Sequence, residues 1–254
     1  MKFVTYSPSE ILKPYIRQFA IQETTEERIY KVLPDTALVI GFQFKGKLSY
    51  LDGEKEISLS SSGITGLRDQ YRVFKNSADI SSVLVFFKDA GAASFIHQPL
   101  HELFRESVSL ENFVKPSELL SIETQLSESN SDMEKIRIIE KFLISRLLHT
   151  EPDQLVLSAI SLIHKSRGNM RISDLMKNLN ISQSPLEKRF RQTVGTSPKK
   201  FASIVRFKHV IENYSPSLSL IDLGLSAGFY DQAHFIKEFK TFTGQTPEEY
   251  FKIG

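Results

Sequence analysis

The chain has no cysteine among its 254 residues. Without cysteine it can form no disulfide, no thiolate zinc site and no cysteine nucleophile, and such a composition suits a reducing compartment. The sequence also has no run that approaches the ~18 apolar residues a membrane helix requires, and its first residues contain no signal-peptide run. We therefore expect a soluble, cytoplasmic protein.

Catalytic and metal-binding motifs are scarce as well. The chain contains no phosphate-cradling glycine loop and no serine, histidine and acid in the order of a hydrolase triad. The histidines of the first 152 residues are His97, His101 and His149; Pro99 separates the first two, and neither lies on a predicted strand. We therefore expect no catalytic site, no metal site and no cofactor, and we do not expect an enzyme.

Charge is divided unevenly along the chain, although the net charge is only +2. Residues 153–254 hold 14 Lys and Arg against 9 Asp and Glu, a net charge of +5. Residues 1–152 then hold 18 against 21, a net charge of −3. A basic part attached to a mildly acidic part is typical of a polyanion-binding domain joined to a domain with another partner.

The basic part contains an internal repeat. Residues 172–201 align without a gap to residues 221–250, an offset of 49 positions. Six positions are identical: Ile172/Ile221, Gln183/Gln232, Lys188/Lys237, Phe190/Phe239, Gly195/Gly244 and Pro198/Pro247. Each copy predicts a helix-turn-helix, at about 172–195 and 220–244. The first helix of each unit is indicated by spaced apolar residues: Ile172, Leu175, Met176 and Leu179, then Ile221, Leu223 and Leu225.

The second helix of each unit has a predicted beginning, apolar face and end. It begins at an N-cap residue, Ser182 or Asp231. Apolar side chains four residues apart share one face, and a glycine followed by a proline ends the helix. These residues are Leu186, Phe190, Gly195 and Pro198 in the first copy, and Phe235, Phe239, Gly244 and Pro247 in the second.

The run GFYDQAHFIKEFKTFTGQTPEEY resembles the C-terminal signature of AraC-type (AraC/XylS) transcription regulators. The upstream copy resembles the first of that family's two helix-turn-helix units, and the resemblance covers about residues 153–251. It implies two recognition helices, joined by one long helix at 197–214, that enter successive major-groove segments of double-stranded DNA. It also implies dimerisation through the N-terminal part, as in many members.

The resemblance assigns base-facing positions in both recognition helices. These are Ser184, Glu187 and Lys188, then Gln232, Ala233, Ile236 and Lys237, and Arg191 and Lys240 also lie on the solvent-facing sides. Lysine donates to guanine, glutamine to adenine, glutamate accepts from cytosine, and isoleucine suits a thymine methyl. Because Ser184 and Lys188 reach less far than an aromatic side chain or an arginine, we expect affinity to depend heavily on phosphate contacts and dimerisation.

The first hundred residues predict β-structure. Runs rich in β-branched and aromatic residues alternate with turn residues, including Ser-Ser-Gly at 61–63. The runs are 15–21, 29–33, 37–44, 47–51, 56–59, 71–74 and 82–87. They predict a small barrel or sandwich, and they resemble, less specifically, the cupin-like sensor domain of AraC-type regulators. Helices are expected at 92–97, 118–126 and 133–148, and Ile136, Ile139, Leu143 and Leu147 form one stripe on the last, either a core face or a dimer seam.

The expected fold class is α+β. A small β-barrel, cupin-like sensor and dimerisation domain with helices (1–150) precedes an all-α DNA-binding domain (153–254), with the boundary near His149 to Asp153, where Glu151-Pro152 interrupts the helical pattern. The expected function is a sequence-specific DNA-binding transcription regulator that responds to a small-molecule effector, with RNA polymerase and a second copy as further partners. The alternatives are a barrel enzyme, metal-dependent or metal-independent, tethered to nucleic acid, and a helical protein-interaction adaptor.

Overall fold

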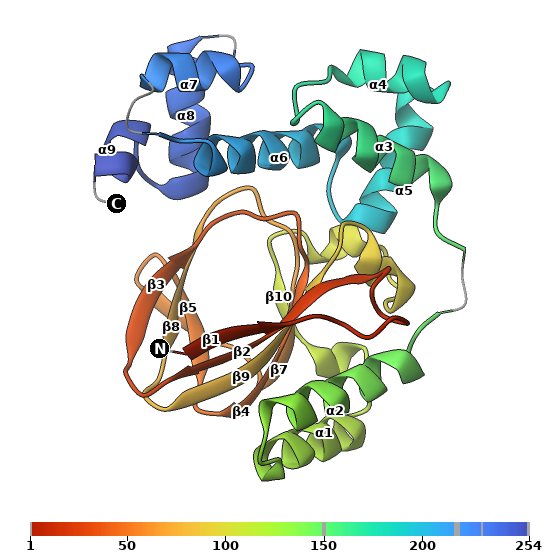
Figure 1. Cartoon of the computed structure of the whole chain (residues 1–254), viewed down its shortest axis with the longest axis vertical. Helices are drawn as coiled ribbons and strands as arrows, with labels where there is room; N and C mark the ends of the chain where they lie inside the picture. Colours follow the sequence, from red (N-terminus) through yellow and green to blue (C-terminus); the bar gives the residue numbers. More distant parts are fainter. Residues whose placement is uncertain (1, 149–150, 216–218, 230, 253–254) are drawn as a thin grey trace.

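The computed structural model of the chain describes residues 2–148, 151–215, 219–229 and 231–252. As the sequence predicts, a β-rich region (the β region, residues 2–109) comes first and a helical region (residues 154–252) comes last (Figure 1). The helical region lies above the β region in Figure 1. His149, considered above as a metal ligand and as the start of the domain boundary, falls outside the described residues.

Within the described residues, the β region forms two antiparallel sheets. The six-stranded sheet has the order β1-β2-β9-β4-β7-β10, and the four-stranded sheet has the order β3-β8-β5-β6. In chain order the strands are β1 (Lys2–Tyr6), β2 (Ile16–Thr24), β3 (Arg28–Val32), β4 (Val39–Lys45), β5 (Leu48–Asp52), β6 (Lys55–Ser58), β7 (Ser62–Thr65), β8 (Arg72–Asn76), β9 (Ile80–Phe87) and β10 (Ser107–Ser109). No described ladder closes the two sheets into a continuous barrel, so the arrangement is an open one that is compatible with a cupin-like jelly roll.

The turn predicted at residues 61–63 is wrong. Ser62 and Gly63 begin β7, which pairs with both β4 and β10, and Gly63 lies opposite Gly41. A Cβ atom on Gly63 would lie 3.3 Å from the carbonyl oxygen of Val108, so glycine here allows close approach of the next strand. The Ser-Ser-Gly composition therefore predicted a turn where the structure has a strand that pairs on both sides. The sequence pattern also missed the edge strands β1 and β10.

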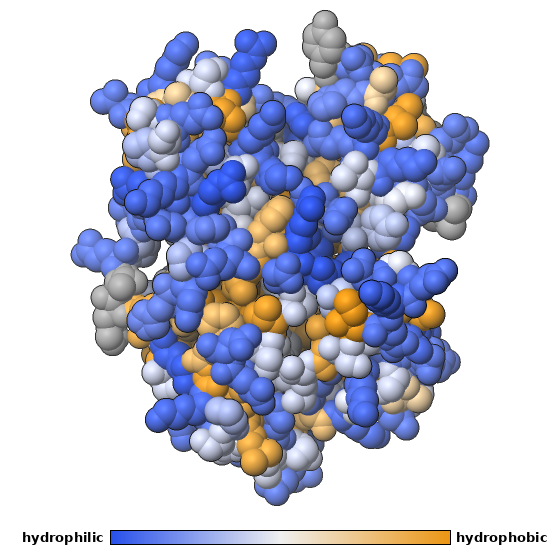
Figure 2. Space-filling model, turned by 180° about the vertical axis from the view of Figure 1, so that it is seen from behind, coloured by the Kyte–Doolittle hydropathy of each residue, from blue (hydrophilic) through white to orange (hydrophobic). Residues whose placement is uncertain are grey.

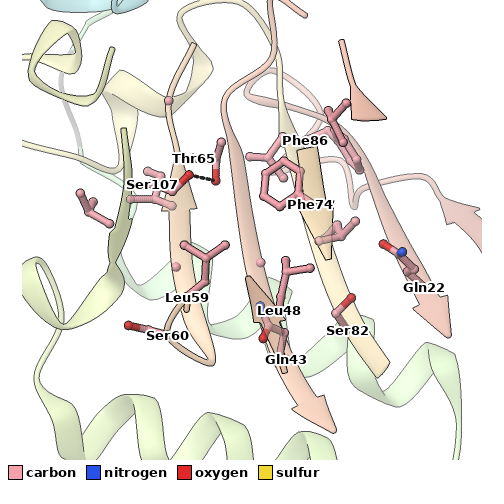
Figure 3. Close-up of a pocket in the computed structure, with 18 of the residues that line it drawn as sticks. Gln22, Gln43, Leu48, Leu59, Ser60, Thr65, Phe74, Ser82, Phe86 and Ser107 are labelled. Carbon is pink, nitrogen blue, oxygen red and sulfur yellow. Dashed lines mark hydrogen bonds between the residues drawn. The ribbon is translucent and has the colours of Figure 1, made fainter. Parts of the chain in front are cut away.

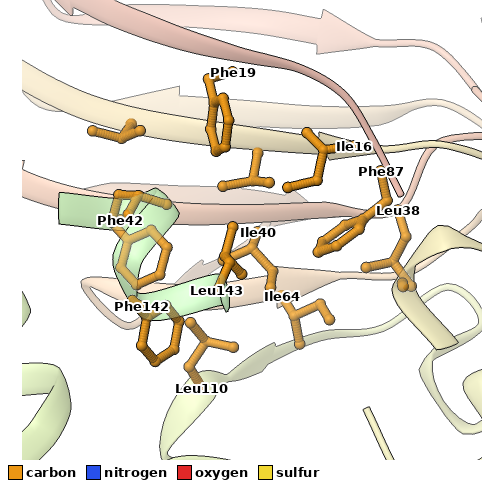
Figure 4. Close-up of a cluster of buried hydrophobic side chains, with 14 of the residues drawn as sticks. Ile16, Phe19, Leu38, Ile40, Phe42, Ile64, Phe87, Leu110, Phe142 and Leu143 are labelled. Atoms are coloured by element: carbon orange, nitrogen blue, oxygen red, sulfur yellow. The ribbon is translucent and has the colours of Figure 1, made fainter. Parts of the chain in front are cut away.

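The six-stranded sheet is covered on its outer face by helices α1 (Pro116–Glu128) and α2 (Asp132–Ser145) (Figures 1 and 4). Phe42 of the sheet meets Phe142 of α2 edge to face, with 5.8 Å between ring centroids. The predicted stripe on α2 is a core face: Ile136, Ile139 and Leu143 are buried. Leu147 lies beyond the end of the helix, which is shorter than the predicted 133–148. The other apolar members of this core include Ile16, Phe19, Ile40, Ile64, Val83, Val85 and Phe87.

The helix predicted at 92–97 is a short 3-10 turn, η1 (Gly91–Ser94). Two further turns follow, η2 (Leu100–Leu103) and η3 (Leu110–Asn112). A Cβ atom on Gly91 would lie 2.1 Å from the carbonyl oxygen of Tyr15. The turn is therefore pressed against the backbone that leads into β2.

The helical region consists of two clusters held by one long helix. Its helices are α3 (Gln154–Lys165), α4 (Ile172–Leu179), α5 (Gln183–Val194), α6 (Pro198–Glu212), α7 (Leu220–Ser226), α8 (Gln232–Thr243) and α9 (Pro247–Lys252). Phe201 and Val205 of α6 belong to the apolar core of α3, α4 and α5, whereas Phe207 and Val210 belong to that of α7 and α8. The joining helix is thus confirmed, although it has 15 residues and ends at Glu212 rather than 214.

The first helices of the two units differ in how well the apolar pattern describes them. Leu175 of α4 is fully buried, as predicted. In α7, Leu223 is buried, but Ile221 and Leu225 are 50% and 57% exposed, so the expected apolar face is wrong for these two residues. Figure 2 shows, from behind, that hydrophilic residues dominate the helical region, while hydrophobic residues gather over the β region.

Candidate nucleic-acid interface and cavity

The helices predicted to read DNA, α5 and α8, have the expected apolar faces and ends. Leu186 and Phe190 of α5 are fully buried, and the equivalent residues Phe235 and Phe239 of α8 are almost so. Gly195 and Gly244 follow the two helices with φ angles of 96° and 78°, the left-handed conformation that glycine adopts without strain. Each copy of the repeat therefore forms the predicted helix-turn-helix.

The two N-caps are not equivalent. Asp231 accepts a hydrogen bond from the backbone N–H of His234 at 2.7 Å, which confirms it as a cap. Ser182 occupies the N-cap position with extended backbone angles, but its hydroxyl accepts no bond from the first turn of α5. The predicted N-cap position of Ser182 is therefore confirmed, but its side chain makes no capping hydrogen bond. Repeat symmetry identified the position but not the hydroxyl orientation.

We expect Asp231→Ala to destabilise the protein by about 1 kcal/mol, because the backbone N–H of His234, in the first turn of α8, would lose its acceptor. Ser182→Ala is the matched control and should change the free energy of unfolding by less than about 0.5 kcal/mol, as surface substitutions usually do. Urea titration followed by circular dichroism measures both. Equal losses in the two variants would contradict the difference in capping.

The predicted base-facing residues lie on the solvent side of the two helices. Glu187 and Ile236 are half-buried, and the others are exposed: Ser184, Lys188, Arg191, Gln232, Ala233, Lys237 and Lys240. Glu187 is engaged within its own helix, since Gln183 Nε2 donates to it at 2.9 Å and Arg191 lies 3.9 Å away. By contrast, the described residues offer no hydrogen-bond or ion-pair partner to the ammonium groups of Lys188 and Lys237.

Both helices end against the β region. A Cβ atom on Gly195 would lie 3.1 Å from the carbonyl oxygen of Leu100, and one on Gly244 would lie 2.6 Å from the ring of Tyr71. Lys31 Nζ of β3 also donates to the carbonyl oxygen of Thr243 at 2.8 Å, at the C-terminus of α8, where a cation is favoured. The N-terminal turns of α5 and α8 lie at the opposite ends, away from the β region, so they are free to approach a ligand.

Three basic residues of α6 bind protein carboxylates. Arg206 donates to both carboxylate oxygens of Glu238 in α8 at 3.0 Å and lies over the ring of Phe229. Lys208 Nζ donates to Asp35 of the β region at 2.8 Å, and Lys200 Nζ pairs with Asp69. These charges hold the helical region together and attach it to the β region.

A cavity of about 430 Å³ lies between the two sheets, on the inner face of the six-stranded sheet (Figure 3). Strand alternation sends Val83, Val85 and Phe87 into the core and Leu84 and Phe86 into the cavity. Most of its side-chain lining is apolar, including Val32, Val39, Leu48, Leu59, Phe74 and Ile80. The volume falls within the range of small-molecule sites.

Polar groups line both ends of the cavity. At one end, Gln22, Ser82 and Gln43 stand in register across β2, β9 and β4. At the other end, Thr65 and Ser107 share a hydrogen bond of 3.0 Å, and Figure 3 shows these two sets of side chains at opposite ends. The cavity therefore has an apolar middle with polar ends.

Arg68 lines the cavity as a buried cation. This residue follows β7 in the chain and is only 5% exposed. Its two terminal nitrogens, Nη1 and Nη2, have no hydrogen-bond partner among the described residues. Burial, with the nearby charge of Arg72, lowers the pKa of Arg68 to about 9, so the guanidinium stays charged at neutral pH. Sequence reasoning missed this residue, because no local pattern distinguishes it from a surface arginine.

Two loops connect the cavity to the helical region. In the β3–β4 loop, Leu33 and Asp35 line the cavity, Leu33 packs against the α7–α8 core, and Asp35 pairs with Lys208. Burial alone would raise the pKa of Asp35, but hydrogen bonds and charges from Arg17 and Lys208 hold that pKa well below its usual range. In the second loop, which joins β7 to β8, Leu67 lies beside Arg68 in the chain and belongs to the α3–α5 core. Cavity-lining segments therefore reach both helix-turn-helix units.

The described residues contain no group of three or more histidines and carboxylates placed to hold a metal ion. His97 lies between η1 and η2, and His101 lies within η2, so neither is on a strand, as expected. Among the described helices, none is long and apolar enough to cross a membrane.

Comparison with known proteins shows similarity in both halves of the chain. Residues 175–253 match a family model described as a helix-turn-helix domain. Residues 4–109 match a model described as a domain of unknown function. Among solved structures, ToxT from Vibrio cholerae aligns with 15% identity and a TM-score of 0.46, covering 93% of this chain and 97% of that chain.

Two curated relatives are named as regulators. The chain is 34% identical over 121 residues to the Msm operon regulatory protein of Streptococcus mutans, covering 45% of this chain and 43% of that protein. It is 27% identical over 150 residues to the HTH-type transcriptional regulator MtrA of Neisseria gonorrhoeae, covering 58% and 47%. The matches thus span less than half the length of either relative. With two helix-turn-helix units on one joining helix, the match to the helix-turn-helix model and these two relatives identify the C-terminal part of this chain as an AraC-type helix-turn-helix domain.

Proposed function

We propose that this protein is a sequence-specific DNA-binding transcription regulator whose β region binds a small-molecule effector. The observation that carries the proposal is the equivalent display of α5 and α8, whose N-terminal turns are exposed and point away from the β region. Lys188 and Lys237, at the same position of the repeat, have free ammonium groups that can donate to guanine or to phosphate. The cavity and the two loops that lead from it support the effector-binding part.

The remaining parts of the proposal concern organisation and partners. We propose residues 1–150 as the sensor and 153–254 as the DNA-binding domain, acting in the cytoplasm with RNA polymerase and as a homodimer. Regulators with such helix-turn-helix domains are normally non-enzymatic, and we propose that the cavity binds its ligand without chemical conversion. Sedimentation at increasing protein concentration tests the homodimer, because a monomer at all concentrations would exclude it.

Lys188→Ala and Lys237→Ala are each expected to weaken binding to the operator by about 1–3 kcal/mol while leaving binding to random DNA nearly unchanged. The reason is that a base-contacting lysine discriminates between base pairs, whereas a phosphate-contacting lysine does not. Fluorescence anisotropy with fragments from the region upstream of the gene, set against a scrambled duplex, measures both affinities.

Lys55→Ala is the matched control, since Lys55 is exposed on β6 of the β region, and it should change neither affinity. Specific binding by the unaltered protein should also fall steeply as salt is raised, because each neutralised phosphate releases counterions. A salt-independent affinity would favour the helical protein-interaction adaptor. Equal losses on specific and random DNA would reassign that lysine to the phosphate backbone.

A further inference from the structure

We propose that the cavity of the β region takes a monocarboxylate with an apolar body, and that Arg68 binds its carboxylate. The inference deepens the proposed function, because it names the chemical class of the effector. It rests on the geometry of one side chain and of the cavity that this side chain faces.

The first step is the missing partner of Arg68. An ionised group removed from water without a partner is costly, and buried charges in proteins are normally paired. The neighbouring arginines follow this rule: Arg72 donates to Ser107 Oγ at 3.0 Å and to the carbonyl oxygen of Arg105 at 2.6 Å, and Arg105 Nε donates to Asp69 at 2.6 Å. Arg68 is buried more deeply than Arg105, yet Nη1 and Nη2 have no acceptor among the described residues. A ligand anion would supply the missing acceptors.

The second step concerns the charge of the ligand. Arg68 and Asp35 are the charged residues among the described residues that line the cavity. Asp35 is already neutralised by Arg17 at 3.0 Å and Lys208 at 2.8 Å. Of the two charged lining residues, Arg68 is therefore the one without a hydrogen-bonded counter-charge, and a single guanidinium matches a monoanion better than a phosphate dianion. A guanidinium binds a carboxylate with two parallel hydrogen bonds, which use both free terminal nitrogens.

The third step concerns the body of the ligand. The walls between the polar ends are formed by aliphatic and aromatic side chains, and Phe74 lies under the guanidinium of Arg68, 5.7 Å from its ring centroid. A compact hydrophilic acid such as a sugar acid would leave its hydroxyl groups unpaired along these walls. An aliphatic or aromatic body with one carboxylate uses both the walls and the cation.

The position of Arg68 gives the ligand a route to the helical region. Its neighbours in sequence are Leu67, which packs into the α3–α5 core, and Asp69, which pairs with Lys200 of α6. A carboxylate bound to Arg68 would thus lie one residue away from two contacts with the helical region, one to the core around α5 and one to α6. Ligand binding at Arg68 can therefore change how tightly the helical region is held.

Titration of the full chain, without DNA, with decanoate, decanol and decyl phosphate tests the proposal. By calorimetry below the micelle concentration, decanoate should bind at least about tenfold more tightly than decanol, as expected for a charge-assisted pair. Arg68→Met should remove this preference and leave the urea midpoint unchanged or raised, because an uncompensated buried charge is lost. Lys55→Met, which removes an exposed charge from the same region, should keep the preference.

Several results would overturn the proposal. Equal affinity of the unaltered protein for decanoate and decanol would show that Arg68 meets no carboxylate, and this comparison needs no variant. A decanoate preference that survives in Arg68→Met would place the carboxylate elsewhere, and tighter binding of decyl phosphate would replace the carboxylate by a phosphomonoester. Should Arg68→Met not fold, Arg68→Lys serves instead and should reduce the preference. None of these measurements uses DNA. The proposed DNA binding is tested separately, by anisotropy, so the two proposals can fail independently.

Discussion

Inserting ~5 base pairs, half a helical turn, between the two DNA segments that α5 and α8 contact is expected to abolish their simultaneous binding. The insertion rotates one segment to the opposite face of the duplex. One recognition helix reads about three base pairs, and each lost pair costs ~1–3 kcal/mol, so the Kd should rise by about a hundredfold or more. Anisotropy with the native and the lengthened duplex measures the change.

The physical reason lies in α6. Phe201 of this helix packs against Phe190 of α5, with 5.5 Å between ring centroids, and Phe207 packs against Phe239 of α8 at 5.7 Å. Both recognition helices are thus fixed to one rigid helix of 15 residues, which spans ~22 Å at ~1.5 Å per residue. The spacing between them cannot stretch to follow the inserted base pairs.

Two further duplexes complete this experiment. An insertion of ~10 base pairs restores the face but not the distance, so a rigid monomer should still lose affinity, whereas two flexibly joined units would recover it. The same ~5 base pairs placed outside the contacted segments should have no effect. If the insertion between the segments leaves the Kd unchanged, only one unit reads bases, and the other copy of the repeat has a structural role.

Gly168→Ala is expected to destabilise the protein by about 2–5 kcal/mol, from strain at a positive φ angle and from overpacking. Gly168 lies in the turn that follows α3, with a φ of +77°, and its N–H donates to the carbonyl oxygen of Ile163 at 2.8 Å. An added Cβ atom would lie 2.2 Å from the carbonyl oxygen of Ala202 and 2.8 Å from the backbone nitrogen of Arg206. Both atoms belong to the backbone of α6, which cannot turn aside as a side chain can.

Gly53→Ala is the matched control, because Gly53 has a φ of +60° and no atom within 4 Å of an added Cβ. This substitution should cost only the conformational part, about 1–2 kcal/mol. Urea unfolding of both variants gives the difference, and operator binding by Gly168→Ala should fall as α3 loses its contact with α6. Equal destabilisation by the two substitutions would mean that the α3–α4 loop yields without disturbing α6.

The sequence alone determined the helical region well, because its signals are local and occur twice. Apolar residues four apart, such as Leu186 and Phe190, share one helix face wherever the helix lies, and a glycine followed by a proline ends a helix for reasons of backbone geometry. The predicted joining helix and both second helices are therefore present within two residues of their expected bounds. The prediction was weaker in α7, where Ile221 and Leu225 fit the apolar periodicity but are exposed to solvent.

The β region shows the limit of such local patterns. β7 begins inside a Ser-Ser-Gly run that predicts a turn, and only its pairing with β4 and β10 makes it a strand. Likewise, Ser182 and Asp231 occupy the same position in the repeat, yet only Asp231 caps its helix through the side chain. Strand pairing and hydroxyl orientation depend on neighbours that are distant in sequence or set by packing.

For function, the sequence by itself determined the class of domain and led to the residues that we propose to face DNA, since both follow from a repeated local motif and its resemblance to a family. Only the tertiary structure decided what the β region offers to a ligand. Arg68 becomes a buried, unpaired cation because two sheets exclude water around it, and Asp35 meets Lys208 although 173 positions separate them. Burial and ion pairing depend on the folded surroundings of a residue, so a local sequence pattern does not predict them.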